Sequence, residues 1–320
     1  MSLTGFVEWV KPTLNQLFDM PTFGMKGEMK AAPLSMHYGF IGTSFDYVLR
    51  LQVAKINKNL VTDFPIVGRI AAKGNKFREQ IITDFELAKT RYLNDELELS
   101  DLLPNCIYLA ILDTLARTGT DSQPSTDEDI KSLMPKKLRN DRDAFKKYKE
   151  LHEEFLPPPL TWTPDPKDIA DLASLTNIVD TKMWQAKTRC ILNPTFGQSS
   201  SYIGGADADL IIDNKLIDIK TTKYLKFTRP YFRQLIGYHL LNCREQEMYK
   251  GLEHLGIYYA RHGLLFTFPI PNMQRNIKFG DEVIDEEVIE SWIQLYHEEI
   301  NKVPPWRIIP QVLDFLKPNK

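Results

Sequence analysis

The chain has 320 residues but only three cysteines, Cys106, Cys190 and Cys243, and none of them forms a C-x-x-C pair. So sparse and scattered a set argues against a disulfide framework, a structural zinc site and a four-cysteine iron–sulfur cluster. Free thiols are typical of proteins in a reducing compartment, so we expect a cytoplasmic protein.

Long apolar runs and nucleotide motifs are also missing. No apolar run approaches the ~18 residues of a membrane span, and we therefore expect no association with a membrane. The N-terminus lacks a basic stretch followed by an apolar one, so the sequence predicts no secretion signal. No G-x-x-x-x-G-K-[ST] pattern occurs, and we expect no nucleotide cofactor.

An excess of charge of one sign is lacking, with 40 basic residues against 42 acidic ones. The distribution is uneven: residues 182–250 hold 11 Lys or Arg against 6 Asp or Glu, and residues 281–300 hold eight acids and no Lys or Arg. A basic middle before an acidic segment is compatible with a polyanion site, although a solvated acidic helix is the better explanation of the acidic segment taken alone.

The first half of the chain has the apolar spacing of helices. We expect them at residues 42–56, 76–93, 100–119 and 139–155. Residues 156–166 then contain five prolines, which no helix tolerates. This break divides the chain into a mainly helical N-terminal region, 1–155, and a second region, 156–320.

The second region alternates between strand and helix patterns. It predicts a short helix at 167–181, a hairpin at 204–223, a helix at 229–246, a hairpin at 252–270 and a C-terminal helix at 285–302. The order hairpin, helix, hairpin predicts an α/β (α+β) fold with a mixed central sheet flanked by helices.

The first hairpin, "GGADADLIIDNKLIDIKTTK", combines one apolar face with one acidic face. Alternate strand residues share a face. If Asn214-Lys215 is the turn, Asp209 pairs with Lys220, and Asp218 lies on the same face as both. The other face is apolar and is expected to pack on the core; it comprises Leu210, Ile212, Ile217 and Ile219.

Two carboxylates a few ångströms apart repel each other, and one takes up a proton unless a cation lies between them. Mg²⁺ or Mn²⁺ suits such oxygen ligands and also accepts phosphate oxygens. A lysine beside the ion positions a water or stabilises developing negative charge. The hairpin therefore predicts metal-dependent phosphodiester hydrolysis; the alternative is an exposed hairpin whose acids guard its edge.

The following helix carries Gln234 and Tyr238, which are four residues apart and share one helical face. Such a pair alone is usually an ordinary half-buried face. The position of this pair, one helix after the Asp-x-Lys strand, supports a role in the same site.

Together these residues read D207-A-D209, D218-I-K220 and Q234-L-I-G-Y238. This pattern resembles the PD-(D/E)XK nuclease superfamily, and more narrowly its RecB-like branch with a Q-x-x-x-Y motif. The chain also resembles a group of bacterial and phage proteins with a GGADADL…DIKTT hairpin. The nuclease resemblance covers residues 203–261 and departs from the family at Ala208, where a proline is usual.

The resemblance implies a restriction-endonuclease-like core and a role for each matching residue. Asp209 and Asp218 would bind Mg²⁺ or Mn²⁺, with the backbone carbonyl of Ile219 as a further ligand, and Lys220 would act on the water or the phosphate. Gln234 and Tyr238 would line the groove. Two choices stay open: Asp207 replaces Asp209 if the register shifts by two, and Asp46, Asp84 or Glu86 supplies an upstream ligand.

The implied activity is that of a Mg²⁺-dependent deoxyribonuclease, exonuclease or endonuclease, in DNA repair, recombination, phage biology or defence. Four cations follow the hairpin and are expected to contact DNA, unless they are simply solvated: Lys223, Lys226, Arg229 and Arg233. The alternatives are a non-catalytic nucleic-acid-binding protein on the same fold and a nuclease that acts on RNA.

Overall fold

The computed structural model describes residues 3–118 and 164–271, apart from 12–13, 16–17 and 246–247, and a few short pieces. These pieces are 142–143, 146, 278–279, 282–283, 293–294 and 296–298. The region boundary at residue 155 lies outside the described residues, and so do most of the helices expected at 139–155 and 285–302.

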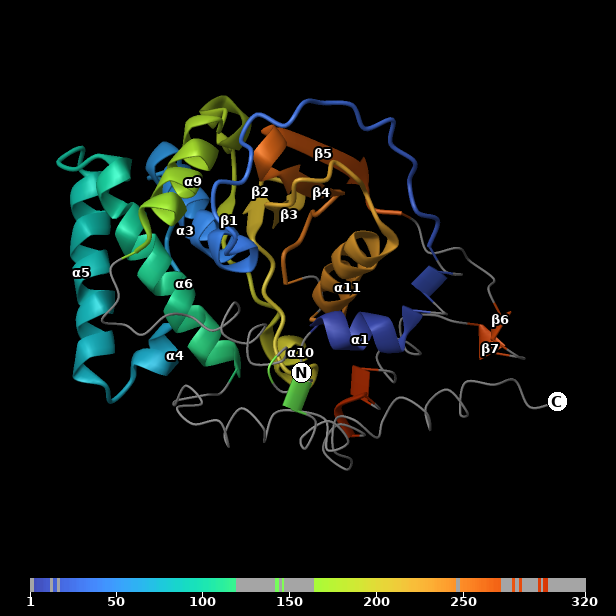
Figure 1. The fold of residues 1–320 in the computed structure, drawn as a ribbon. Helices are drawn as coiled ribbons and strands as arrows, with labels where there is room; N and C mark the ends of the chain where they lie inside the picture. The colour runs from blue at the N-terminus through green and yellow to red at the C-terminus, as the bar shows by residue number, and fades with distance from the viewer. Residues whose placement is uncertain are drawn as a thin grey trace.

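A five-stranded mixed sheet with the order β1-β2-β3-β4-β5 forms the centre of the molecule (Figure 1). Strands β3 and β4 are parallel, and the other neighbours are antiparallel. The strands are β1 (Cys190–Leu192), β2 (Leu210–Ile212), β3 (Lys215–Lys220), β4 (His254–Tyr259) and β5 (Leu264–Pro269). The expected mixed sheet and the expected α+β class are confirmed.

Helices of the N-terminal region cover one face of the sheet (Figure 1). The largest are α3 (Tyr38–Ile56), α5 (Lys76–Leu93) and α6 (Leu103–Thr118), joined by α4 (Arg69–Ala72) and η1 (Leu99–Leu102). Two helices of the second region, α9 (Pro166–Asn177) and η3 (Thr181–Trp184), pack against α3. Helix α5 begins after Asn75, whose side chain accepts hydrogen bonds from the N–H groups of Phe77 and Arg78. The expected helical character of this region is confirmed.

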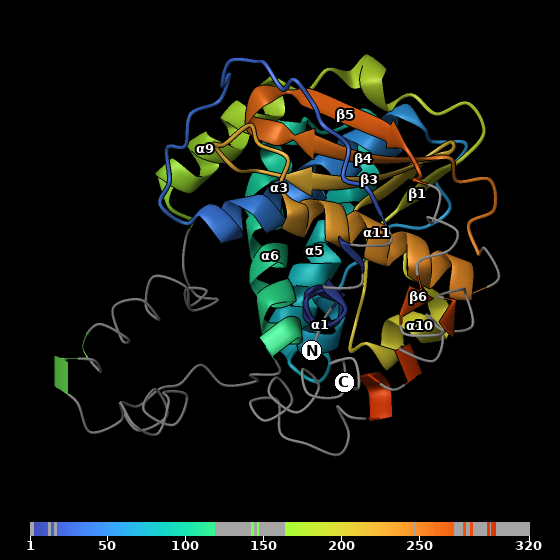
Figure 2. The same ribbon diagram turned by 90° about the vertical axis from the view of Figure 1, so that its right-hand side faces the viewer.

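Helix α11 (Arg229–Arg244) connects β3 to β4 and lies on the opposite face of the sheet, as a parallel strand pair requires (Figure 2). Helix α1 (Leu3–Trp9) packs against it, and α10 (Gly197–Tyr202) lies nearby. The contact needs Gly237, because a Cβ there would come within 2.8 Å of the Leu3 side chain. The N-terminal helix thereby closes over α11.

The sheet is buried on both faces, as its near-continuous apolar strands indicate. Leu210 and Ile217 face the core under α3 and α6, whereas Ile211 and Leu216 face the core under α11. The side chain of Asp218 belongs to the second face, since alternate residues of β3 share one side. The predicted acidic face is thus covered by α11.

The hairpin register differs from the prediction by two positions. Ile212 pairs with Lys215 and Leu210 with Ile217, so the turn is Asp213-Asn214. Asp213 adopts a φ of 52°, and its carboxylate accepts N–H groups from the loop at residues 187–189. Because a shift of two keeps every side chain on its face, the predicted faces survive although the predicted register is wrong.

The second predicted hairpin, around His262-Gly263, is confirmed as β4 and β5 joined by the short helix η4 (Ala260–His262). Gly263 ends this helix with a φ of 62°, a left-handed conformation that glycine adopts without strain. A separate pair of short strands, β6 (Lys278–Phe279) and β7 (Glu282–Val283), is antiparallel.

One segment, Leu99–Arg117, is long and apolar enough to cross a membrane by length and composition alone. Of its most apolar window, 56% is buried inside the structure, and α6 packs closely on α3. This burial is consistent with the core helix of a soluble protein.

Candidate metal and catalytic site

The site lies where β2 and β3 stop pairing. Their ladder ends at Leu210 and Ile217, whereas the pairing of β2 with β1 continues one residue further, with the Asp209 carbonyl accepting a hydrogen bond from Asn193 N–H. The Asp209 carboxylate accepts the Ile219 N–H at 2.5 Å, in place of a backbone partner. The two strands therefore open around Asp209 and the backbone of Ile219.

Asp218 and Lys220 stand on β3 at this opening. The Asp218 side chain is only 4% exposed, and its Oδ2 lies 2.6 Å from Lys220 Nζ. Lys220 Nζ also donates to Gln234 Oε1 at 3.0 Å and lies 5.1 Å from the centre of the Tyr231 ring. Helix α11 thus contributes a second set of contacts to the lysine.

A chain of hydrogen bonds continues from the lysine through α11. Gln234 Nε2 donates to Tyr238 Oη at 3.0 Å, and this hydroxyl donates to the backbone carbonyl of Asp207 at 2.9 Å. The i,i+4 spacing of Gln234 and Tyr238 makes the link, as the sequence pattern indicated. The structure therefore brings together the five residues predicted to be catalytic.

The charges of the site do not balance. Burial raises the pKa of Asp209 well above its usual range, and the charges of Asp218 and Asp46 raise it further. Burial alone would lower the pKa of Lys220, but the nearby Asp218 and Asp209 carboxylates raise it above its usual value. One protonated lysine therefore faces two acids, and Asp209 favours either a proton or an additional cation.

Two cavities flank Asp209. One, of about 220 Å³, is lined by the Asp218, Lys220, Gln234 and Tyr238 group and is closed on one side by Leu3 of α1. The other, of about 240 Å³, is lined by Asp46, Asp113, Asn193 and Thr221. Arg117, Asp207, Asp209 and Ile219 belong to both cavities and form the wall between them.

Asp46 of α3 is the upstream acid that reaches this wall. Its Oδ2 lies 2.5 Å from Arg50, and its Oδ1 is buried without a hydrogen-bond partner among the described residues. Burial raises the pKa of Asp46, and Arg50 offsets part of that rise. The other two candidate ligands lie elsewhere on α5, where Asp84 accepts from Gln80 and Glu86 pairs with Arg69 and Lys89.

Asp207, the alternative to Asp209, is held by other groups. Its two carboxylate oxygens accept hydrogen bonds from the Arg117 guanidinium at 2.8 and 3.3 Å. The observed register is shifted by two, which was the condition for Asp207 to replace Asp209. Because Arg117 already occupies the Asp207 carboxylate, Asp209 is still the better placed ligand. Arg117 and Asp113 were not predicted as site residues, and the only sign of them in the sequence is their charge on the otherwise apolar helix 100–119.

The donor set suits a hard divalent ion. N–H and C=O of one strand residue point to the same side, so the Ile219 carbonyl faces the opening that its N–H faces. With Asp209 and Asp218, it supplies oxygen ligands of the kind that Mg²⁺ and Mn²⁺ prefer. The described residues hold no cluster of three His, Cys, Asp or Glu at metal-binding spacing, so waters would complete the set.

The basic segment after β3 is only partly available to a ligand. Lys223, Lys226 and Arg229 are exposed. Arg233, in contrast, is 8% exposed and forms an ion pair with Glu8 of α1. The assignment of Arg233 to a DNA surface is corrected, because a buried and paired guanidinium does not reach a phosphate.

Comparison with protein-family models, with curated proteins and with solved structures finds no match. Interpretation of the site therefore depends on its geometry and chemistry.

Proposed function

We propose that the protein is a Mg²⁺- or Mn²⁺-dependent deoxyribonuclease that hydrolyses phosphodiester bonds at Asp209, Asp218 and Lys220. One observation carries the proposal: two acids and a lysine converge where the β2–β3 ladder opens around Ile219. A purely structural ion pair between Asp218 and Lys220 would not require a second buried acid with a raised pKa.

The residues present divide the work. Asp209, Asp218 and the Ile219 carbonyl would hold the ion, which, when bound, lowers the pKa of a water and polarises the phosphodiester. Lys220 donates a hydrogen bond to the phosphate oxygen on which negative charge develops. Gln234, fixed by Tyr238, keeps the ammonium group in place.

Two further features support a DNA substrate in the cytoplasm. Three exposed cations, Lys223, Lys226 and Arg229, lie between the catalytic strand and α11, where a phosphate backbone would pass. Cys106, Cys190 and Cys243 are free thiols, as is usual in a reducing compartment.

The test is incubation of the purified full-length protein with linear, circular and single-stranded DNA and with RNA of matching sequence. Each is incubated with Mg²⁺, with Mn²⁺ and with EDTA. We expect DNA cleavage with either metal, and none with EDTA or in Asp218→Asn. Cleavage of circular DNA identifies an endonuclease, and cleavage of linear DNA alone an exonuclease.

Two results would contradict the proposal. Cleavage of RNA alone would identify a ribonuclease. Binding of DNA without cleavage under every metal condition would identify a non-catalytic nucleic-acid-binding protein on this fold.

A further inference from the structure

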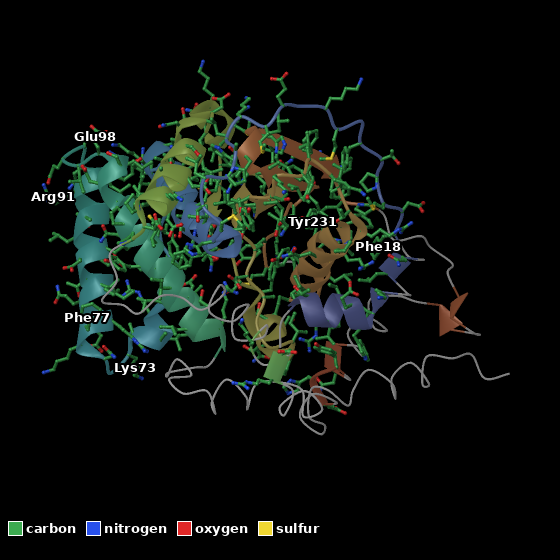
Figure 3. All side chains as sticks on the ribbon, in the orientation of Figure 1. Phe18, Lys73, Phe77, Arg91, Glu98 and Tyr231 are labelled. Carbon is green, nitrogen blue, oxygen red and sulfur yellow. The ribbon has the colours of Figure 1, made fainter. Side chains whose placement is uncertain are left out.

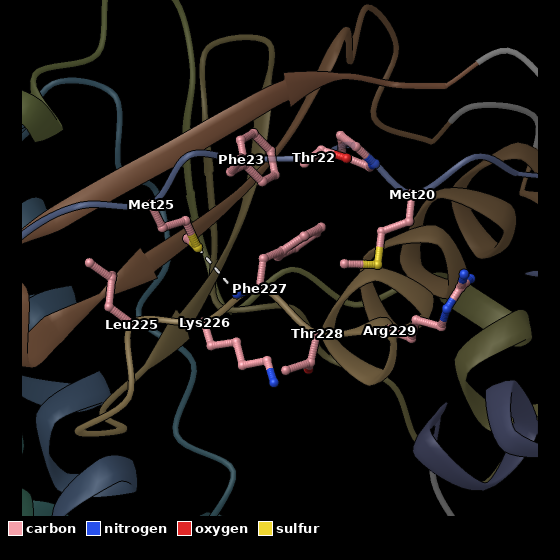
Figure 4. Close-up of a pocket in the computed structure, with 10 residues that line it drawn as sticks. Met20, Thr22, Phe23, Met25, Leu225, Lys226, Phe227, Thr228 and Arg229 are labelled. Atoms are coloured by element: carbon pink, nitrogen blue, oxygen red, sulfur yellow. Dashed lines mark hydrogen bonds between the residues drawn. The ribbon is translucent and has the colours of Figure 1, made fainter.

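A groove of about 670 Å³ lies between the extended segment 20–25 and the loop 225–229, which leads from β3 into α11 (Figure 4). Its volume falls within the ~300–1,000 Å³ range of ligand sites. None of the catalytic roles given above to Asp209, Asp218, Lys220, Gln234 or Tyr238 uses it.

The interior of the groove is aromatic and rigid. Phe23 and Phe227 are partly exposed and meet edge to face, with ring centres 5.1 Å apart. The Phe227 N–H donates to Met25 Sδ at 3.1 Å (Figure 4). The Phe227 ring also packs against the Phe268 ring, with ring centres 5.7 Å apart. Because folding has already fixed these rings, a planar ligand would lose little entropy of the protein on binding.

The rim of the groove is basic. Lys226 and Arg229 line it and are exposed, and none of its lining residues is acidic. Within the part of the chain that the structure describes, neither cation forms an ion pair. Lys223 and the exposed Tyr224 ring, with Nζ 5.2 Å from the ring centre, continue the same alternation of cation and aromatic residue.

Helix α11 links the groove to the catalytic site. Arg229 begins this helix, and Tyr231, whose ring contacts Lys220, is two residues further on. Gln234 lies five positions after Arg229, which is about 7.5 Å along a helix axis. This corresponds to about two stacked nucleotides at ~3.4 Å each.

We propose that this groove binds an unpaired stretch of DNA strand next to the scissile phosphate, with a base against Phe23 and Phe227 and phosphates on Lys226 and Arg229. The proposal rests on the proposed function, from which the DNA substrate comes. Aromatic rings in a basic groove are the usual means of binding single strands. The base faces of a duplex are stacked inside it, so a duplex would contact only the cations of the groove. An apolar peptide would contact only the aromatic rings.

The first experiment measures binding in EDTA, so that no metal-dependent cleavage occurs. The probes are a fluorescent oligothymidine and a DNA hairpin with the same number of phosphates. We expect the double variant Lys226→Glu/Arg229→Glu to bind oligothymidine at least about tenfold more weakly and with a smaller salt slope. Lys73→Glu is a control for a single charge reversal away from the groove: this exposed lysine lies between α4 and α5, and Figure 3 shows it far from Tyr231.

The second experiment tests stacking. Phe23→Leu and Phe227→Leu keep apolar side chains of similar bulk, and thermal melting checks that the fold is retained. We expect about tenfold weaker binding of oligothymidine and no change for the hairpin duplex. An oligonucleotide with 5-iodouracil should form photo-crosslinks to Phe23, Tyr224 or Phe227.

Either of two outcomes would overturn the inference: unchanged oligothymidine affinity in the charge-reversed variant, or crosslinks that map away from segments 20–25 and 223–229. Oligouridine bound at least about tenfold more tightly than oligothymidine would overturn the assignment to DNA. Metal-dependent cleavage without DNA binding in the groove would contradict the role of the groove but not the proposed nuclease activity. DNA binding in the groove without cleavage would contradict the proposed nuclease activity but not the role of the groove.

Discussion

The two cavities that flank Asp209 neutralise their carboxylates with different cations. On the side of Asp46 the partner is an arginine, Arg50, and on the side of Asp218 the partner is Lys220. Asp207, in the wall between the two cavities, pairs with Arg117. A guanidinium is permanently charged and fixes planar contacts, whereas an ammonium group is a compact charge with freely rotating donors. We infer that the arginine side holds the site in place and that the lysine side performs the chemistry.

The contacts on the arginine side agree with this division. Arg50 is 1% exposed, lies 4.2 Å above the Tyr47 ring and donates to the Pro65 carbonyl at 2.9 Å. The Tyr47 hydroxyl donates to Asp113 at 2.7 Å. Lys220 instead lines a cavity and is 20% exposed.

The largest effect should come from the lysine. Lys220→Gln keeps a hydrogen-bond donor beside Asp218 but removes the charge, so we expect a loss of roughly 10²–10³ in the single-turnover cleavage rate. DNA affinity measured in EDTA should change little. Lys215→Gln, at the other end of β3, is the control, and equal rates for the two variants would end the distinction between the cavities.

Metal affinity should depend strongly on Asp209 and weakly on Asp207, the two acids in the wall between the cavities. Removing a residue that only supports a metal-coordinating side chain lowers metal affinity by about 10–100-fold. Asp209→Asn removes the coordinating carboxylate itself, so it should weaken Mn²⁺ binding by at least about 100-fold. Asp207→Asn should have a much smaller effect, because Asp207 is held by Arg117. Titration calorimetry checks both, and the opposite order would restore Asp207 as the ligand.

The acid–base behaviour of Asp113 should appear in stability. Burial raises its pKa to about 6, although the hydrogen bond from Tyr47 lowers it in part. An Asp in the unfolded chain titrates near ~3.9. The neutral Asp113 therefore contributes its full stabilisation of the wild-type fold below pH ~4, and this stabilisation is lost as the pH rises through about 6. Asp113→Asn keeps an acceptor for Tyr47, so above pH ~7 the variant should gain about 2 kcal/mol relative to its difference at pH ~4.

Denaturant titrations of Asp113→Asn and wild type at several pH values measure this difference. Asp84→Asn is the control, because Asp84 is exposed on α5. A pH-independent difference between wild type and Asp113→Asn would show that Asp113 is charged throughout.

The smallest effect on metal affinity should come from substitution of the upstream acid Asp46. Asp46→Asn retains an acceptor for Arg50 and should weaken Mn²⁺ binding by about tenfold, as expected for a group that adjusts the site from one side. Asp84→Asn and Glu86→Gln, also upstream acids, should leave the affinity unchanged. If all three variants bind alike, the cavity of Asp46 does not take part in metal binding.

Local patterns were enough to predict most of the secondary structure. The period of two residues put Leu210 and Ile217 on one face, and the i,i+4 spacing linked Gln234 to Tyr238, because both depend only on backbone geometry. The register was not predictable in this way. Asp213 is held by N–H groups of residues 187–189, a contact between separate segments that fixes the turn.

Contacts between residues distant in the sequence also explain the other differences. The ion pair of Arg233 with Glu8 spans 225 positions, so a basic segment read alone gave no sign that this arginine is buried. Asp46 looked no better than Asp84 or Glu86 until α3 was placed against the sheet. Strand β1 was not predicted, because a strand of three residues is too short to show a periodic pattern.

The hydrogen bond from Ile219 N–H to the Asp209 carboxylate makes the hydrogen exchange of this amide sensitive to the charge of Asp209. Amides within a ladder exchange with deuterium only when strands separate, but this one depends on the charge of a single side chain. Protonation of Asp209, or an ion that draws its carboxylate away, weakens the acceptor. The exchange rate of the Ile219 amide therefore reports the charge state of Asp209 in the intact protein.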